Sequence, residues 1–119
     1  MAAITKRPRR IWKGERLFVY GALLDPNERL RLLGREVPAE AARLIGYRRG
    51  RARFFYVIPS PGETVEGRIL SDFDGDDFAI LDRYEEVPTL YTRERISVLD
   101  SSDDPIECWI YKPTGWERG

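Results

Sequence analysis

The spacing of apolar and polar residues predicts five β-strands along the chain. The first, at 16–20, is an apolar and aromatic run that stops at Gly21, which is typical of a mostly buried strand. Further strand patterns occur at 42–58, which is rich in arginine, and at 65–70, 93–99 and 106–111. The sequence Pro-Ser-Pro-Gly at 59–62 is typical of a turn, so we expect it to reverse the chain between the second and third strands.

The first predicted helix lies between the first two strands. Asp25 is a typical N-cap, and Pro26 suits the first helical position, where no partner for its missing N–H is needed. Glu28 predicts a capping box with Asp25, and Gly34 is a natural end for the helix. We therefore expect about two helical turns with leucines on the apolar side.

The second predicted helix runs from about Asp77 to Glu85, with Phe78, Leu81 and Tyr84 on its buried side. The aspartates at 72–77 do not fit a calcium-binding EF-hand loop, because the glycine falls at the fourth loop position instead of the sixth. They predict a polar turn and an N-cap. The resulting order β-α-β-β-α-β-β has no repeated βαβ unit, so it favours an α+β domain or a small closed barrel.

Length and composition restrict both the architecture and the chemistry. At 119 residues the chain has room for one core, so we expect a flexible basic arm at 1–13 and a single domain at 14–119. It has no histidine and a single cysteine, Cys108, which excludes imidazole bases, intrachain disulfides and thiolate zinc sites. We expect carboxylates, tyrosines or lysines to carry any acid–base work, with no metal and no cofactor.

Two further features bear on cellular location. The apolar runs are far shorter than the ~20 residues that span a bilayer, and no secretory signal pattern opens the chain. With the lone cysteine, they lead us to expect a cytoplasmic location and no membrane partner. The sequence leaves the oligomeric state open.

Charge is distributed unevenly along the chain. Residues 1–53 carry 14 basic and 5 acidic side chains, whereas residues 54–119 carry 6 and 15. The arginines at 43–53, with the aromatic residues that follow, would suit a contact with nucleic acid. We favour the interpretation that the two halves interleave in one domain and neutralise each other, so we expect no nucleic-acid partner.

Two places in the sequence are candidates for chemistry. At 20–24 a strand stops at a glycine before a helix, where backbone N–H groups can point at a carboxylate, although plain tight turns share this pattern. At the end of the second predicted helix stand Glu85 and Glu86, where the partial negative charge of the helix end disfavours a carboxylate. Such residues are common on solvated surfaces, so a functional role requires one of them to turn into an apolar cavity.

Four motifs together resemble the gamma-glutamylcyclotransferase-like family in order and spacing, over about residues 16–112. They are Phe-Val-Tyr-Gly-Ala-Leu-Leu at 18–24, Val-Glu-Gly-Arg-Ile-Leu at 65–70, Leu-Asp-Arg-Tyr-Glu at 81–85 followed by Tyr-Thr-Arg at 91–93, and Trp-Ile-Tyr at 109–111. The resemblance implies a small mixed β-barrel flanked by short helices, with a cavity at one end. It also implies an enzyme of acyltransferase or lyase type that cyclises a γ-glutamyl amino acid or amine to 5-oxoproline, releasing the free amine.

The resemblance assigns roles to individual residues. Glu85 matches the catalytic acid/base, and Tyr111 matches an aromatic residue that the family presents to the cavity. The loop whose main chain holds the α-carboxylate end of the substrate corresponds to Tyr20, Gly21, Ala22 and Leu23. The substrate's own α-amine attacks its own γ-carbonyl, so the reaction needs no protein nucleophile, metal or cofactor.

The proton transfer sets a physical requirement on Glu85. A glutamate with an ordinary pKa of ~4.3 lies about four units below an α-amine at ~8, which makes proton transfer roughly 5 kcal/mol uphill. An apolar pocket lined by Phe18 and Tyr20 would raise the pKa of Glu85 to about 6–7. The same carboxyl, once protonated, then returns the proton to the leaving amine.

Two positions depart from the family pattern. Ala22 stands where many relatives have serine or threonine, and Glu86 stands where many have glycine. Two alternatives therefore stay open. In one, Glu86 is the working residue; in the other, the protein binds a small metabolite in the same cavity without catalysis.

Overall fold

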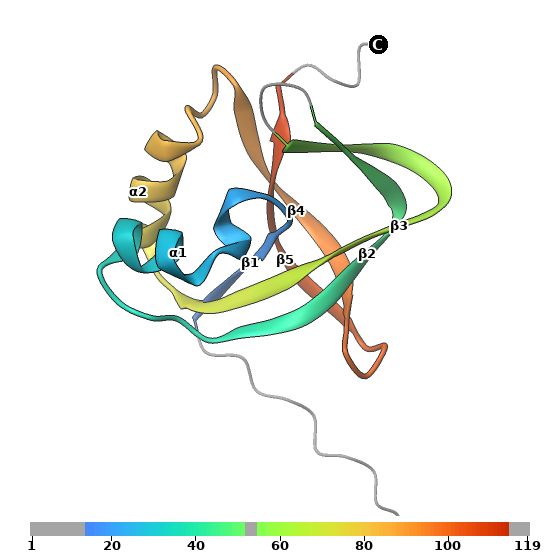
Figure 1. The fold of residues 1–119 in the computed structure, drawn as a ribbon, viewed down its shortest axis with the longest axis horizontal. Helices are drawn as coiled ribbons and strands as arrows, with labels where there is room; N and C mark the ends of the chain where they lie inside the picture. The colour runs from blue at the N-terminus through green and yellow to red at the C-terminus, as the bar shows by residue number, and fades with distance from the viewer. Residues whose placement is uncertain (1–13, 52–54, 115–119) are drawn as a thin grey trace, which may run out of the picture.

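The computed structural model describes residues 14–51 and 55–114, and the predicted basic arm at 1–13 lies outside the described residues. The described residues form five strands, two helices and one short 3₁₀ turn, arranged as in Figure 1. In chain order these are β1 (Glu15–Val19), η1 (Ala22–Leu24), α1 (Pro26–Leu33), β2 (Ala39–Arg51), β3 (Phe55–Phe73), α2 (Gly75–Tyr84), β4 (Tyr91–Asp100) and β5 (Pro105–Pro113).

The strands close into a barrel in the order β1-β3-β2-β4-β5. β1 runs parallel to β5, while β1 with β3, β2 with β3, β2 with β4 and β4 with β5 are antiparallel, so the sheet is mixed. The two helices lie side by side against one flank of the barrel (Figure 1). The expectation of a small mixed barrel with short flanking helices is confirmed. No helix in the described part of the chain is long and apolar enough to cross a bilayer.

Buried apolar side chains form two layers that meet at the first strand. Phe18 and Tyr20, the residue after β1, belong to a cluster whose other members all lie in strands, and this cluster fills the barrel. Leu17 and Val19 point the other way, as the two-residue alternation of a strand requires, and join a second cluster with residues of the helices. The second cluster therefore attaches α2 and η1 to the outside of the barrel, next to the end of β1.

β1 and β3 approach each other unusually closely at Gly67. A Cβ atom there would lie 2.3 Å from the carbonyl oxygen of Val19 and 2.6 Å from the ring of Phe18. Only glycine leaves room for this contact. The close approach fixes the end of β1 just before the loop that begins at Tyr20.

The predicted chain reversal at 59–62 is wrong. Ile45 pairs with Thr64, whereas Tyr47 pairs with Pro59, so the intervening residues of β3 bulge out of the ladder. Both strands continue, still paired, beyond this point. The turn-forming residues make a bulge inside a long hairpin, a position where the missing N–H of proline is tolerated.

The first helix has the predicted ends but not the predicted capping box. Asp25 is the N-cap, with its carboxylate accepting a backbone N–H of the first turn at 2.9 Å, and Gly34 closes the helix with a φ of 74°. The carboxylate of Glu28 does not reach back to Asp25. It accepts hydrogen bonds from Arg31 at 2.7 Å and from the hydroxyl of Tyr84 at 3.0 Å.

The second helix begins at Gly75, two residues before the predicted start at Asp77. Asp74 is the N-cap, and Asp74 and Asp77 form a reciprocal capping box with bonds of 3.0 Å and 2.9 Å. A capping box built from two aspartates escaped the sequence analysis because the usual signal pairs Ser or Thr with Glu or Gln. Phe78 and Leu81 are buried, as predicted.

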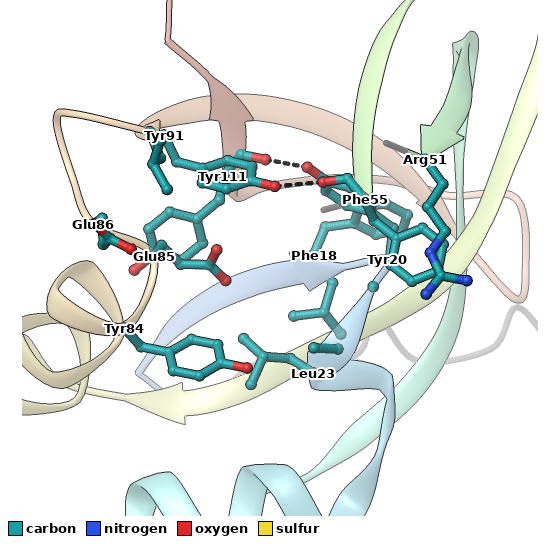
Figure 2. Close-up of a pocket in the computed structure, with 14 residues that line it drawn as sticks. Phe18, Tyr20, Leu23, Arg51, Phe55, Tyr84, Glu85, Glu86, Tyr91 and Tyr111 are labelled. Carbon is teal, nitrogen blue, oxygen red and sulfur yellow. Dashed lines mark hydrogen bonds between the residues drawn. The ribbon is translucent and has the colours of Figure 1, made fainter. Parts of the chain in front are cut away.

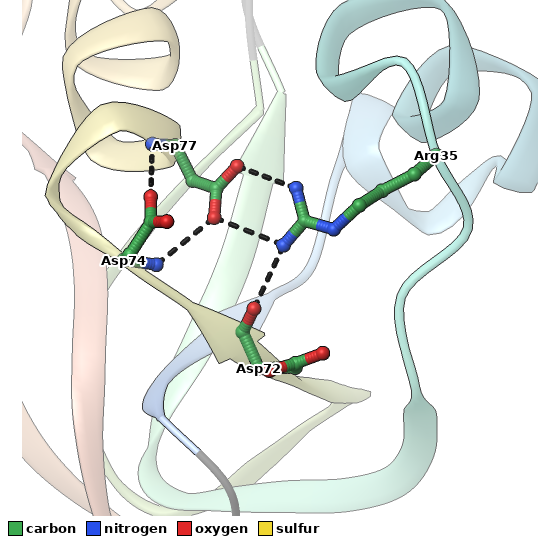
Figure 3. Close-up of polar contacts among 4 residues, drawn as sticks. All are labelled: Arg35, Asp72, Asp74 and Asp77. Atoms are coloured by element: carbon green, nitrogen blue, oxygen red, sulfur yellow. Dashed lines mark hydrogen bonds and ion pairs between the residues drawn. The ribbon is translucent and has the colours of Figure 1, made fainter.

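Arg35 ties the segment after α1 to the start of α2 (Figure 3). Its guanidinium donates to the two carboxylate oxygens of Asp77 at 2.7 Å and 3.0 Å, and to the carbonyl oxygen of Asp72 at 2.7 Å. This contact lowers the pKa of the buried Asp77 carboxyl below its usual range. Arg35–Asp77 and the exposed pair Arg43–Asp103 both join the basic half of the chain to the acidic half, as the interleaved arrangement requires.

We expect Asp77→Asn to lower the free energy of unfolding by roughly 2 kcal/mol at pH 7, because it removes a paired carboxylate that also caps a helix. The pKa of Asp77 is lowered in the folded state, so its contribution is present above the unfolded pKa of ~3.9 and disappears as the pH falls below it. Urea denaturation at pH 7 and pH 3 measures both effects. Asp76→Asn, on an exposed neighbour, is the matched control. Equal losses of unfolding free energy in the two variants would contradict the stabilising role of the Asp77 carboxylate.

Candidate functional site

A cavity of about 350 Å³ opens where one end of the barrel meets the end of α2 (Figure 2). The chain brings to it the end of β1, the η1 turn, the facing ends of β2 and β3, and the start of β4. The lining residues are Phe18, Val19, Tyr20, Gly21, Ala22, Leu23, Arg51, Phe55, Tyr84, Glu85, Glu86, Leu90, Tyr91 and Tyr111. All the residues predicted for the site from the sequence therefore lie around one cavity.

Two arginines hold the loop that runs from Tyr20 to Leu23. Arg49 donates to the carbonyl oxygen of Tyr20 at 2.9 Å, and the buried Arg29 donates to the carbonyl oxygens of Leu23 and Leu24 at 3.0 Å each. The turn between them begins at a glycine with no side-chain cap. Because the first N–H groups of such a turn have no partner within it, the loop can offer backbone donors to an anion.

Glu85 carries the carboxyl group that enters the cavity. It is the C-cap of α2, where its N–H donates to the carbonyl oxygen of Leu81 at 2.8 Å, and Figure 2 shows its side chain turned inward. Burial raises the pKa of this carboxyl to about 7. No side chain among the described residues donates a hydrogen bond to it, so nothing offsets the loss of water around the ionised form.

Four tyrosines border the cavity, and each directs its hydroxyl hydrogen elsewhere. Tyr20 donates to the carbonyl oxygen of Tyr111, Tyr91 to that of Phe55, Tyr111 to the carboxylate of Asp82, and Tyr84 to the carboxylate of Glu28. Burial raises the pKa of all four phenols, to about 12 for Tyr84 and Tyr91. They therefore line the site with neutral rings, which keeps the surroundings of the carboxyl apolar.

A polar network that the sequence analysis missed supports Tyr111 from outside the cavity. Asp82 accepts the Tyr111 hydroxyl at 2.7 Å and pairs with both ends of the Arg93 guanidinium at 3.0 Å and 3.3 Å. The guanidinium lies over the rings of Phe78 and Trp109, 4.2 Å and 4.5 Å from their centroids. Asp82 and Arg93 lie within the motifs that carried the family resemblance, but nothing in their spacing says that they meet.

Glu86 occupies a left-handed backbone position, which fits the glycine that the family resemblance implies there. Its φ of 55° is left-handed, its N–H donates to the carbonyl oxygen of Arg83 at 3.1 Å, and the N–H of Val87 donates to that of Asp82 at 2.9 Å. These two bonds form a Schellman motif, whose left-handed residue is most often glycine. The side chain of Glu86 is exposed at the edge of the cavity, while that of Glu85 points inside (Figure 2).

The cavity also contains residues that the sequence did not predict. Arg51, Phe55, Tyr84, Leu90 and Tyr91 come from strand ends and from the segment after α2, which only the closed barrel brings together. Within the described ranges, no group of three or more His, Cys, Asp or Glu side chains is arranged to hold a metal ion.

Comparisons with known proteins agree with this geometry. The sequence model of the family described as gamma-glutamyl cyclotransferase, AIG2-like, matches residues 17–118. AIG2-like protein D of Arabidopsis thaliana is 34% identical over 102 residues, which cover 80% of this chain and 64% of that protein. The chain thus spans slightly less than two thirds of this curated relative.

Solved structures show the same fold. A protein of Arabidopsis thaliana with a known solution structure matches with a TM-score of 0.76 and 24% identity, over 85% of this chain and 69% of its own. A structure named gamma-glutamyl cyclotransferase matches with a TM-score of 0.68 and 22% identity, over 84% and 66%. At these low sequence identities, the two matches show that the fold is shared and nothing more.

We expect Glu85→Gln to change how stability depends on pH. The native carboxyl, with a raised pKa, holds its proton more tightly than the unfolded one, so the wild type loses stability as the pH rises from 4.5 to about 7. The glutamine variant has no such loss. Relative to the variant, the wild type should therefore lose roughly 3 kcal/mol between pH 4.5 and pH 8. Urea denaturation measures the difference, with Glu86→Gln as the control for losing one acidic side chain. Parallel curves for the wild type and Glu85→Gln would contradict the burial of this carboxyl.

We expect Glu86→Gly to stabilise the protein by about 1 kcal/mol, because glycine adopts the left-handed conformation without steric cost. Thermal or urea denaturation reads the gain. Arg83→Gly, which removes a side chain from the last turn of α2 at ordinary helical φ, is expected to destabilise the protein by a similar amount. A loss of stability in Glu86→Gly would show that its side chain makes a contact that outweighs the backbone strain.

Proposed function

Because the chain belongs to the gamma-glutamyl cyclotransferase, AIG2-like family, we propose that it is an enzyme that cyclises γ-glutamyl compounds. The substrate's α-amine attacks its γ-carbonyl carbon, a C–N bond forms, and the amide bond to the outgoing amine breaks. The products are 5-oxoproline and a free amino acid or amine. The observation that carries the proposal is the inward carboxyl of Glu85, with a pKa of about 7, in a cavity of suitable size.

The Tyr20–Leu23 loop is proposed to hold the α-carboxylate end of the substrate. Its uncapped turn offers backbone N–H groups, and the arginine contacts at its two ends fix its carbonyl oxygens. Tyr111 and its neighbours then confine the flexible γ-glutamyl arm. Holding the amine close to the carbonyl is the largest share of the catalysis, since well-oriented intramolecular attack is worth roughly 7–11 kcal/mol.

Glu85 is proposed as the base and then the acid. With a pKa of about 7 it lies roughly one unit below an α-amine at ~8, so taking the amine proton is only ~1.4 kcal/mol uphill. The carboxylic acid that results donates this proton to the nitrogen of the outgoing amine as the amide bond breaks. A carboxyl that titrates near pH 7 serves in both directions.

The lone, buried Cys108 is consistent with action in the reducing cytoplasm. The proposal requires no metal and no cofactor, since the reacting groups all belong to the substrate and Glu85.

A second candidate is a non-catalytic protein that binds the same compounds. Ala22 favours it, because the loop lacks the hydroxyl that many relatives have at this position. Backbone donors survive that change, so binding alone does not separate the two candidates. Product formation does.

We expect Glu85→Gln to lower kcat for 5-oxoproline formation by at least a hundredfold, with a much smaller change in KM, because glutamine neither accepts nor returns the proton. The assay follows 5-oxoproline release from γ-glutamyl amino acids and γ-glutamyl amines. For the wild type, kcat/KM should rise with pH through about 7 as Glu85 ionises.

Glu86→Gln is the matched control, since it removes the adjacent carboxyl from the edge of the cavity. Loss of activity in this variant alone would make Glu86 the working residue. Substrate binding without any product from the wild type would support the non-catalytic candidate.

A further inference from the structure

The cavity has an uneven distribution of charge. Glu85 stands at one side of it, and Arg51, at the end of β2, stands at the opposite side (Figure 2). Among the described residues that line the cavity, Arg51 is the only one with a permanent positive charge. An anionic part of a bound molecule would therefore be attracted to the Arg51 side.

The guanidinium of Arg51 has no protein carboxylate as a partner within residues 14–51 and 55–114. It lies over the ring of Phe55, 4.9 Å from the ring centroid. This stacking fixes the position of the guanidinium. Its N–H donors, which lie in the plane of the guanidinium, stay available to bind an anion. Arg49, which also lies over Phe55 at 4.8 Å, differs because it donates to the carbonyl oxygen of Tyr20.

Phe55 connects Arg51 to the proposed substrate loop. A Cβ atom on Gly21 would lie only 3.1 Å from the Cβ of Phe55, so the ring-bearing residue packs directly against this glycine. Arg51, Phe55 and the loop thus form one wall of the cavity. The charge lies beside the backbone donors of the loop and away from the carboxyl that moves the proton.

We propose that Arg51 binds a carboxylate of the substrate. This inference rests on the proposed function. It adds to the binding of γ-glutamyl compounds a guanidinium–carboxylate contact at the side of the cavity opposite Glu85. Arginine suits this task because its planar donors match the two oxygens of a carboxylate.

Two carboxylates could supply this contact. One is the α-carboxylate of the γ-glutamyl group, which every substrate of the proposed reaction carries. The other is the carboxylate of an amino acid that leaves as the product, which a simple amine lacks. A matched pair of substrates separates them, because γ-glutamylethylamine is γ-glutamylalanine without the carboxylate of its leaving group.

The experiment compares the wild type, Arg51→Gln, Arg51→Lys and Arg48→Gln with both substrates. We expect Arg51→Gln to raise KM about tenfold or more with little change in kcat, because a charge-assisted contact made throughout the reaction is lost. Arg51→Lys should recover part of the affinity. Arg48 lies on the same strand, is exposed and does not line the cavity, so Arg48→Gln controls for the loss of one positive charge.

A rise in KM for both substrates assigns Arg51 to the α-carboxylate, and a rise for γ-glutamylalanine alone assigns it to the leaving amino acid. KM values for Arg51→Gln that equal those for Arg48→Gln with both substrates would overturn the inference and leave the proposed function intact.

The dissociation constant of γ-glutamylalanine, measured by calorimetry for the same four proteins, gives a readout that does not need turnover. Binding weakened by Arg51→Gln in a protein that forms no product would keep the inference and overturn the proposed function. If the wild type neither binds nor cyclises either compound, both are overturned.

Discussion

The carboxyl of Glu85 is surrounded by tyrosine rings whose hydroxyl hydrogens are all directed to other acceptors, and the properties of the cavity follow from this arrangement. If one of these phenols donated to Glu85 instead, it would stabilise the ionised form and oppose the rise in the pKa. The bonds from Tyr20 to the β5 backbone and from Tyr91 to the β3 backbone also connect strands across the opening of the barrel. The same interactions therefore hold the walls in place and keep their inner faces apolar.

Much of the fold was predictable because it depends on local signals. The strand runs at 16–20, 65–70, 93–99 and 106–111, the Asp25 cap and the glycine stop at Gly34 act over a few residues, and these appear in the structure. The predicted strand at 42–58 is wrong, because its residues are divided between β2 and β3, which pair with each other. The Pro-Ser-Pro-Gly segment is predicted as a turn but forms a bulge. The same residues favour both structures, and only the pairing of the whole hairpin decides between them. The early start of α2 was missed for a similar reason, since its capping box uses two aspartates.

The candidate site was predictable only where it lies within motifs. Glu85, the Tyr20–Leu23 loop and Tyr111 follow from the family resemblance, and the structure places them around one cavity. Arg51 carries no signal of its own in an arginine-rich strand. Closure of the barrel places it at the cavity, where no carboxylate among the described residues pairs with it, while Arg49 donates to a backbone carbonyl.

The parallel contact between β1 and β5 joins the two ends of the described chain, and it has a consequence for how the protein folds. The hydrogen bond from Tyr20 to Tyr111 links residues 91 positions apart, so nearly the whole chain must be in place before it forms. Contacts at such separation close large loops and belong to slow-folding topologies. The β2–β3 hairpin joins residues that are closer in the sequence, whereas the cavity is complete only when the first and last strands are paired. A fragment that lacks the first or the last strand therefore lacks one wall of the cavity.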